Sequence, residues 1–141
     1  MPEQENIAVL TRFIEEVINQ GDFDAADEIV EENFVELDPL PRQRQGREGL
    51  KEVIGIMRAA FPDIHWVADE TIASGDKVVT RFTWTGTHRG PFLGIPATGK
   101  HVTVKGVVID RLSGRKMADS RILMDSLAMM QQLGVIPTPG S

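Results

Sequence analysis

The sequence predicts an α+β fold, in which helices near the N-terminus are followed by a run of antiparallel strands. Up to about residue 61, apolar residues recur at steps of three and four, which is typical of amphipathic helices. From Ile64 to Asp125, β-branched and aromatic residues predominate and partly alternate with polar ones, as in half-buried strands. Helices that cover the concave side of a curved sheet enclose an apolar pocket, where we expect a ligand.

Length and composition indicate one globular domain. The chain has 141 residues, of which 41% are hydrophobic and 26% are charged. We therefore expect a single domain over residues 1–134 and a flexible tail rich in proline and glycine over residues 135–141. The net charge of −6 disfavours binding to nucleic acid. No secretory signal or membrane segment is visible, so we expect a cytoplasmic protein.

Three helices are expected in the first part of the chain, each from the spacing of its apolar residues. The first covers residues 7–18. The second covers residues 23–30 and begins after Asp22, whose side chain can accept hydrogen bonds from the free amide groups of the first turn. The third covers residues 47–61 and ends there because a proline follows.

The middle of the chain predicts strands and one irregular loop. Residues 34–37 form a short apolar stretch, and the prolines within residues 38–41 interrupt regular structure. Residues 77–88 predict a long strand. Residues 89–99 contain several glycines and prolines together with large apolar side chains, so we expect an irregular loop that packs against the domain.

The last third of the chain predicts a hairpin followed by a helix. Ser113 and Gly114 form the expected turn into a strand at residues 115–124, and Asp125 caps a helix that ends at Leu133. Within the preceding strand, residues 101–112, side chains alternate between two faces. One face holds Val102, Val104, Gly106, Val108 and Asp110.

Five segments together resemble one known family. They are residues 19–26 (NQGDFDAA), 38–41 (DPLP), 58–63 (RAAFPD), 86–100 (GTHRGPFLGIPATGK) and 125–134 (DSLAMMQQLG). This set resembles the SnoaL-like polyketide cyclases, in the ester cyclase-like branch of the nuclear transport factor 2-like superfamily. The resemblance implies a cone-shaped α+β barrel with a strongly curved, mostly antiparallel sheet, whose concave side the N-terminal helices cover. It also implies a pocket for a small apolar or polycyclic molecule, and a homodimer.

The resemblance also indicates where this chain departs from the family. It implies an acid/base carboxylate at position 122 and a histidine at position 108, but this chain has Ile122 and Val108 there. Neither side chain can transfer a proton. The epoxide hydrolases of the same fold have an Arg-x-Asp motif where this chain has Arg81 to Thr83, so only the arginine is kept.

Asp38 and Arg81 are the candidate catalytic residues. Relatives place a polar pocket residue at position 38, and a carboxyl group among apolar walls can act as a general acid or base. The planar guanidinium of Arg81 can bind an enolate or a carboxylate. Each residue has a structural alternative: Asp38 can shape the turn before Pro39, and Arg81 can form an ion pair with Asp38 or Asp119.

Six further residues are expected to contact a substrate in the pocket. They are Trp66, Thr83, Phe92, Val108, Ile122 and Met124. Residues that could hold a metal or cofactor are scarce: the chain has no cysteine and only three histidines, which form no metal-binding motif. No glycine-rich phosphate-binding motif is present. We expect no cofactor and no metal.

Three functions follow as hypotheses. The first is a cofactor-independent acid/base enzyme that cyclises or isomerises a small apolar carbonyl compound, with Asp38 as the acid or base. The second is a non-catalytic module that binds an apolar molecule or dimerises, because Ile122 and Val108 replace the usual acid/base groups. The third is an epoxide hydrolase-like reaction, which requires a rearranged pocket that uses Asp119 or Asp125.

Overall fold

The structure, a computed structural model, describes residues 2–139 of the chain. Its helical elements are α1 (Pro2–Arg12), η1 (Phe13–Asn19), α2 (Phe23–Ile29), α3 (Gly46–Ala60) and α4 (Ser126–Leu133). Its strands are β1 (Val30–Glu36), β2 (His65–Ser74), β3 (Lys77–Thr87), β4 (His101–Ser113) and β5 (Lys116–Met124). This order confirms the predicted α+β fold.

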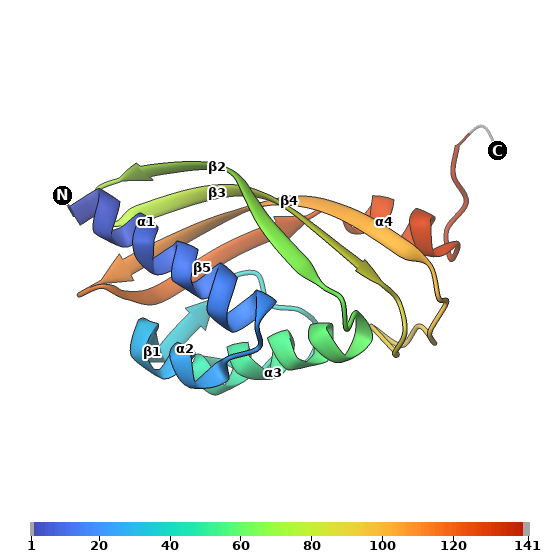
Figure 1. The fold of residues 1–141 in the computed structure, drawn as a ribbon, viewed down its shortest axis with the longest axis horizontal. Coiled ribbons are helices and arrows are strands. Elements are labelled where there is room, and N and C mark those ends of the chain that lie inside the picture. Colours follow the sequence, from blue (N-terminus) through green and yellow to red (C-terminus); the bar gives the residue numbers. More distant parts are fainter. Residues whose placement is uncertain (1, 140–141) are drawn as a thin grey trace.

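A curved sheet of five strands forms one layer, in the order β1-β5-β4-β3-β2. Strand β1 pairs with β5 in parallel, and the other neighbours are antiparallel. The N-terminal helices α1, α2 and α3 lie along the concave side of the sheet, as predicted (Figure 1). The sheet does not close on itself, since β1 and β2 are its two edges. The space between sheet and helices is therefore where a core or a cavity can form.

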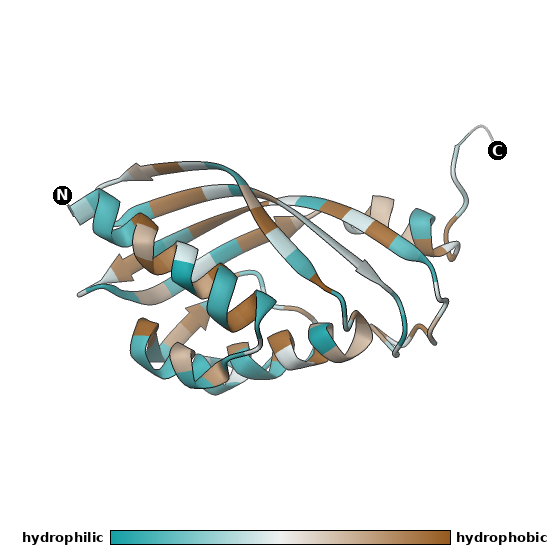
Figure 2. Ribbon diagram, in the orientation of Figure 1, coloured by the Kyte–Doolittle hydropathy of each residue, from teal (hydrophilic) through white to brown (hydrophobic). Residues whose placement is uncertain are grey.

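The core follows from the alternation of side chains along the strands, which Figure 2 shows as bands of brown and teal. On β3, Val78, Phe82 and Trp84 are fully buried against the helices. Val102 and Val104 continue the same inner face on β4, as the sequence predicted. This face carries the apolar area whose removal from water stabilises the fold.

The first helix differs from the prediction in its last two turns. Residues Phe13–Asn19 form a π-helix directly after α1, where a regular α-helix was expected. At its end, the side chain of Asn19 donates to the carbonyl oxygen of Trp66 at 3.0 Å and accepts from its backbone amide at 2.7 Å. These two hydrogen bonds attach the end of the widened helix to β2. Such π-helical segments are uncommon and often occur at functional sites.

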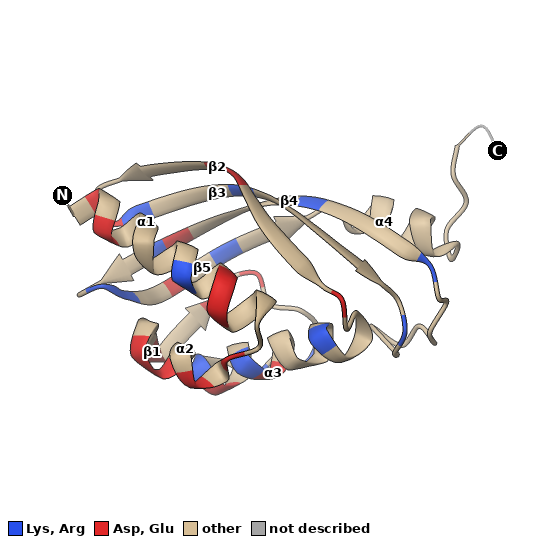
Figure 3. Ribbon diagram, viewed as in Figure 1, with Lys and Arg blue, Asp and Glu red and all other residues tan. Residues whose placement is uncertain are grey.

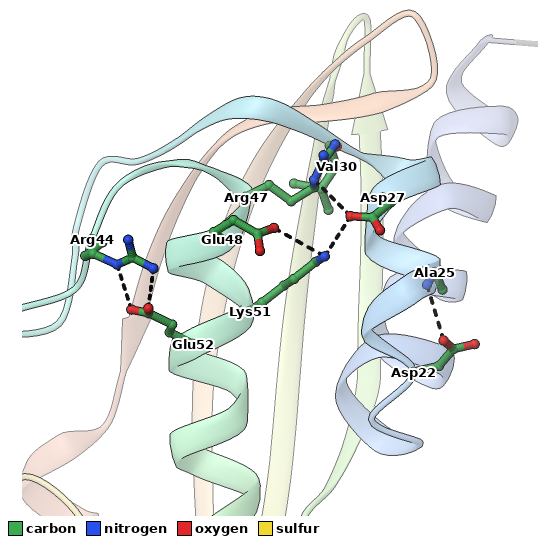
Figure 4. Close-up of polar contacts among 9 residues, drawn as sticks. All are labelled: Asp22, Ala25, Asp27, Val30, Arg44, Arg47, Glu48, Lys51 and Glu52. Atoms are coloured by element: carbon green, nitrogen blue, oxygen red, sulfur yellow. Dashed lines mark hydrogen bonds and ion pairs between the residues drawn. The ribbon is translucent and has the colours of Figure 1, made fainter.

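Ion pairs on the outer surface hold α3 against α2. Charged residues concentrate on these helices (Figure 3). Lys51 Nζ lies 2.7 Å from Asp27 Oδ1 and 3.3 Å from Glu48, and Arg47 donates to the carbonyl oxygen of Val30 at 3.2 Å (Figure 4). Exposed pairs of this kind contribute little free energy each.

The glycine- and proline-rich loop after β3 packs against the domain, as predicted. Phe92 is 2% exposed, and its ring centroid lies 5.6 Å from that of Phe61. The ring of His88, which is fully buried, also stacks on Phe61, with the two ring centroids 5.3 Å apart. His88 Nδ1 also accepts a hydrogen bond from the backbone of Thr98 at 3.2 Å. The loop is thus anchored at both of its ends.

The last helix, α4, begins and ends where the sequence predicted. The Asp125 side chain accepts from the backbone amide of Ala128 at 3.0 Å and caps α4. Residues 135–139 contain no helix or strand, and the last two residues of the predicted tail lie outside the described part of the chain. None of the helices between residues 2 and 139 is long and apolar enough to cross a membrane.

Two glycine-to-alanine substitutions should have opposite effects on stability. A Cβ at Gly106 would lie 2.5 Å from both the Leu123 carbonyl oxygen and the Phe82 ring, so Gly106→Ala should lower the free energy of unfolding by about 1–3 kcal/mol. A Cβ at Gly55, in the middle of α3, would meet only the Phe23 ring at 3.9 Å. Gly55→Ala should therefore raise the free energy of unfolding by up to about 1 kcal/mol.

Urea denaturation of the two variants beside the unmodified protein measures both changes. A Gly106→Ala variant as stable as the parent would contradict the close packing of the Phe82 ring against Gly106 of β4.

Candidate functional site

A cavity of about 430 Å³ lies between the helices and the inner face of the sheet. Most of its wall is apolar. The helices contribute Leu10, Phe13, Ile14, Ile18, Leu50, Val53, Ile54 and Met57, and the strands contribute Phe34, Trp66, Phe82, Val108, Met117, Ile122 and Met124. The π-helical segment supplies three of these side chains, so its wider turns form part of the wall. A cavity of this size and character fits a small, largely apolar molecule.

Polar groups gather on one row of the sheet, which crosses three strands. Glu36 on β1 pairs with Ser120 on β5, and Ser120 pairs with Asp110 on β4. Because side chains at directly paired positions lie on the same face, all three point into the molecule. Their residues are 7%, 4% and 2% exposed, respectively, and all three line the cavity. The cavity therefore has one acidic side in an apolar wall.

Asp110 is the more deeply buried of the two carboxyl groups. Burial raises its pKa to about 7, although a hydrogen bond from the Ser120 hydroxyl favours the charged form. The neighbouring charges of Glu36 and Asp119 raise the pKa further. Its Oδ2 atom is buried and has no hydrogen-bond partner. A carboxyl oxygen that titrates near neutral pH is thus free to meet a ligand.

Glu36, which lies two strands away beyond Ser120, has a similar environment. Burial raises its pKa to about 7, and backbone amides of Asp38 and Leu37 that donate to the carboxylate offset part of this effect. Its backbone is held on both sides by Gln45, whose side chain accepts from the Glu36 amide at 3.0 Å and donates to the Glu36 carbonyl oxygen at 3.2 Å. These two hydrogen bonds hold in place the end of β1, which carries the carboxylate.

Two more polar atoms in the wall lack a protein partner. They are the indole Nε1 of Trp66 and the hydroxyl of Thr80, both buried and both in residues that line the cavity. The Trp66 ring stacks on Phe82 with centroids 4.2 Å apart, which fixes its orientation. Buried polar groups are normally hydrogen-bonded, so unpaired groups around one cavity indicate a place where a ligand supplies the partners.

Four of the six predicted contact residues line the cavity. Trp66, Val108, Ile122 and Met124 are in its wall, and Met124 also accepts a hydrogen bond from the indole of Trp84 at 3.3 Å. The other two, Thr83 and Phe92, do not line it. Thr83 lies on the outer face of β3, where its hydroxyl donates to Asp69 at 2.5 Å. Phe92 is buried instead against Phe61.

The structure does not bring the predicted catalytic pair together. Asp38 lies at the cavity but is exposed to solvent just after β1. Arg81 does not line the cavity; its side chain is 52% exposed and lies 3.8 Å from Asp69 and 3.4 Å from Glu70. The reason is the strand period, because Arg81 sits between two inward-facing residues and must point outward. An ion pair was the predicted alternative for Arg81, but its partners differ from the two expected.

Glu36 and Asp110 are the residues that the sequence analysis missed as candidates for chemistry. The signal for Asp110 was present, since strand alternation already placed it on one face with Val108 and Val104. Glu36 gave no comparable signal, because its neighbour Ser120 lies on a strand more than 80 residues later in the chain. In the sheet, Asp110 and Ser120 form the inward-facing pair next to Val108 and Ile122. The acidic groups thus lie one inward-facing row away from the positions that the family resemblance implied.

No group of three or more histidine, cysteine or acidic residues in the described part of the chain is arranged to hold a metal ion. The polar groups of the cavity wall are instead three carboxyl groups, of which that of Asp38 is exposed, together with hydroxyl groups, the amide of Gln43 and the indole of Trp66. Such a set can accept a proton, donate a proton and hydrogen-bond to an oxygen atom. The arrangement is therefore suited to proton transfer on an uncharged, apolar molecule.

The two buried carboxyl groups predict a particular dependence of stability on pH. Their pKa values are about 7 in the folded protein and start from 3.8 and 4.5, so the folded protein binds more protons than the unfolded chain between those limits. The free energy of unfolding should fall as the pH rises from about 5 to 8, by on the order of 5 kcal/mol. Urea denaturation across this range measures the change.

The variant Asp110→Asn should be more stable than the parent at about pH 8 and nearly equal to it at about pH 5, because the amide needs no charge in the interior. Glu70→Gln, on the outer face of the sheet, is the matched control and should leave the pH dependence unchanged. A parent protein whose stability increases from pH 5 to 8 would contradict the raised pKa values.

Comparison with known proteins agrees with this architecture. The profile of the family described as SnoaL-like polyketide cyclase matches residues 8–133. The structure of TsrD from Streptomyces laurentii superimposes with a TM-score of 0.87 at 28% identity, covering 94% of this chain and 97% of that one. A candidate polyketide cyclase from Acidithiobacillus ferrooxidans gives a TM-score of 0.81 at 30% identity, with 92% and 94% covered.

A candidate SnoaL-like polyketide cyclase from Jannaschia gives a TM-score of 0.86 at 26% identity, over 96% of this chain and 95% of that one. The comparison with curated proteins found no significant match. The family profile nevertheless spans most of the chain, and the sheet with its covering helices fits the fold of these structures. The protein therefore belongs to the SnoaL-like polyketide cyclase family.

Proposed function

We propose that this protein is a cofactor-independent acid/base enzyme that catalyses an aldol-type ring closure or an isomerisation of a small apolar carbonyl compound. One observation carries the proposal: Asp110 and Glu36, both titrating near neutral pH, lie on either side of Ser120 in the wall of a largely apolar cavity. Groups with such a pKa are effective general acids and bases at physiological pH. Family membership supports a polyketide-like substrate.

Asp110 is the general base in this proposal. Its unpartnered Oδ2 takes the proton from the carbon next to a substrate carbonyl group, and the electron pair left behind forms an enolate. In a ring closure, the enolate carbon attacks a second carbonyl carbon, and the resulting alkoxide takes up one proton. Protonated Glu36 can supply that proton. The proton on Asp110 then passes to Glu36, which returns both carboxyl groups to their starting protonation states. No atom is lost and no oxidant is needed.

The enolate oxygen needs hydrogen-bond donors, which the cavity offers without any basic side chain. The indole of Trp66 and the hydroxyl of Thr80 are buried donors without a protein partner. Donors that are already oriented in a site shielded from water stabilise a developing negative charge well. These two residues take the role that the sequence analysis assigned to Arg81.

A second function is favoured by the same unpaired groups. A cavity with free hydrogen-bonding atoms also suits a protein that binds an apolar molecule without converting it. The two proposals differ in one measurable respect, because binding alone does not exchange protons on the ligand.

The predicted homodimer stays a prediction. Val107, Ile109 and Leu123 are exposed on the outer face of the sheet, where a partner could bind.

Exchange of carbon-bound hydrogen tests the enzymatic proposal. Apolar ketones such as 2-tetralone and a set of aryl β-keto esters are incubated with the protein in deuterated buffer, and deuterium incorporation beside the carbonyl group is followed by NMR. The protein should accelerate incorporation, with a rate that rises as Asp110 ionises through about pH 7. Asp110→Asn should reduce the accelerated rate by about 100-fold or more, since it removes the base.

The control is Glu70→Gln, a change of an exposed carboxylate on the outer face of the sheet, which should leave the rate unchanged. Acceleration that survives in Asp110→Asn would exclude Asp110 as the base. Binding of the same ketones without any acceleration would favour the non-catalytic alternative.

A further inference from the structure

The charges around the cavity are all of one sign. The ionisable residues in its wall are Glu36, Asp38 and Asp110, and no lysine, arginine or histidine of the described chain lines it. The nearby Asp119 is already engaged, since Arg111 Nε donates to its Oδ2 at 2.7 Å. That arginine is therefore committed to a carboxylate outside the cavity wall. The two buried carboxyl groups have no basic side chain as a partner.

Buried carboxylates are normally paired with a positive charge. Here Asp110 accepts one hydrogen bond from Ser120 and leaves Oδ2 unpaired, and the Glu36 carboxylate accepts hydrogen bonds from the backbone amides of Leu37 and Asp38. The missing positive charge can be a proton on each carboxyl group, or it can be a cation brought by a ligand. The unpaired oxygen atom is buried and belongs to a residue that lines the cavity, so a ligand in the cavity is the partner that we consider.

The remaining wall determines which kind of cation fits. Divalent metal ions such as magnesium and calcium prefer six or more oxygen ligands, whereas this wall is mainly aromatic and aliphatic. The rings of Phe13, Phe34, Trp66 and Phe82 line the same cavity. Aromatic faces attract organic cations and also pack well against an apolar skeleton. The wall thus suits a nitrogen cation that carries a hydrophobic body.

We propose that this cavity selects ligands in which a protonated amine is attached to an apolar skeleton, with the ammonium group placed between Asp110 and Glu36. An ammonium group offers three N–H donors. In this proposal its acceptors are the free Oδ2 of Asp110, the carboxylate of Glu36 and the hydroxyl oxygen of Ser120 or Thr80, all in residues that line the cavity. The inference rests on the site of the proposed function but not on its reaction, since it requires binding only.

Three probes of the same shape and different charge test the proposal. They are 2-naphthylmethylamine, which is cationic, 2-naphthylmethanol, which is neutral, and 2-naphthoate, which is anionic. Isothermal titration of the full chain at about pH 8, where the carboxyl groups are ionised, should give an affinity for the amine at least about tenfold above that for the alcohol. The anion should bind more weakly than either. At about pH 5.5 both carboxyl groups are protonated, and the preference for the amine should disappear.

Two variants show which groups recognise the cation. Asp110→Asn and Glu36→Gln should each reduce the affinity for the amine and leave that for the alcohol within about twofold, because only the charge is removed. The matched control is Glu70→Gln, which should change neither. Since Asp110→Asn is expected to fold well at pH 8, its binding can be compared directly, and the pH comparison on the unmodified chain needs no variant.

Several results would overturn the proposal. These are equal binding of amine and alcohol at pH 8, no binding of the amine, or a preference that persists in the double variant Asp110→Asn and Glu36→Gln. Displacement of the amine by magnesium or calcium ions would assign the carboxylates to a metal instead. The two proposals fail separately. If the protein does not accelerate deuterium exchange on ketones, the preference for amines can still be observed. If it shows no preference for amines, exchange activity can still be observed.

Discussion

The two-residue period of the strands is the constraint on which both the core and the candidate site depend. On β3 it turns Val78, Thr80 and Phe82 toward the helices, and it turns Arg81 outward to its acidic partners. On β4 the same period places Asp110 in the interior. A shift of one residue in the pairing would exchange the two faces and leave the arginine buried and the aspartate in solvent.

Burying Asp110 and Glu36 without a basic partner has a cost, and the architecture around them explains why the fold tolerates it. The surrounding strands bury large side chains such as Trp84 and Phe34, and this burial drives folding. The carboxyl groups can also avoid the full cost by remaining protonated near neutral pH. Stability and chemistry are therefore linked, because the burial that raises their pKa values also makes them useful acids and bases.

The position of the acidic groups also bears on how this chain relates to its family. Val108 and Ile122 are paired across β4 and β5, and the next inward-facing pair consists of Asp110 and Ser120. Successive inward-facing pairs lie two residues apart along each strand, so a functional group can occupy one pair or the next and still face the same cavity. A scaffold with one concave cavity can thus hold polar groups at different depths, which is one way in which a single fold supports several functions.

Much of the fold and part of the site could be read from the sequence. Periodicity predicted the positions of the helices, although not the π-helical end of the first one, and also the long strands and the inward face that carries Val108 and Asp110. The residue types at the helix starts predicted the Asp22 and Asp125 caps. All of these features depend on local sequence. Tertiary structure alone decided that Glu36 joins Ser120 and Asp110 in one row, since this contact crosses a parallel pairing between distant segments. It also decided the partners of Arg81 and the absence of any basic side chain beside the described cavity wall. Spacing along the chain carries no information on such pairings, whereas burial and charge in the folded protein depend on them.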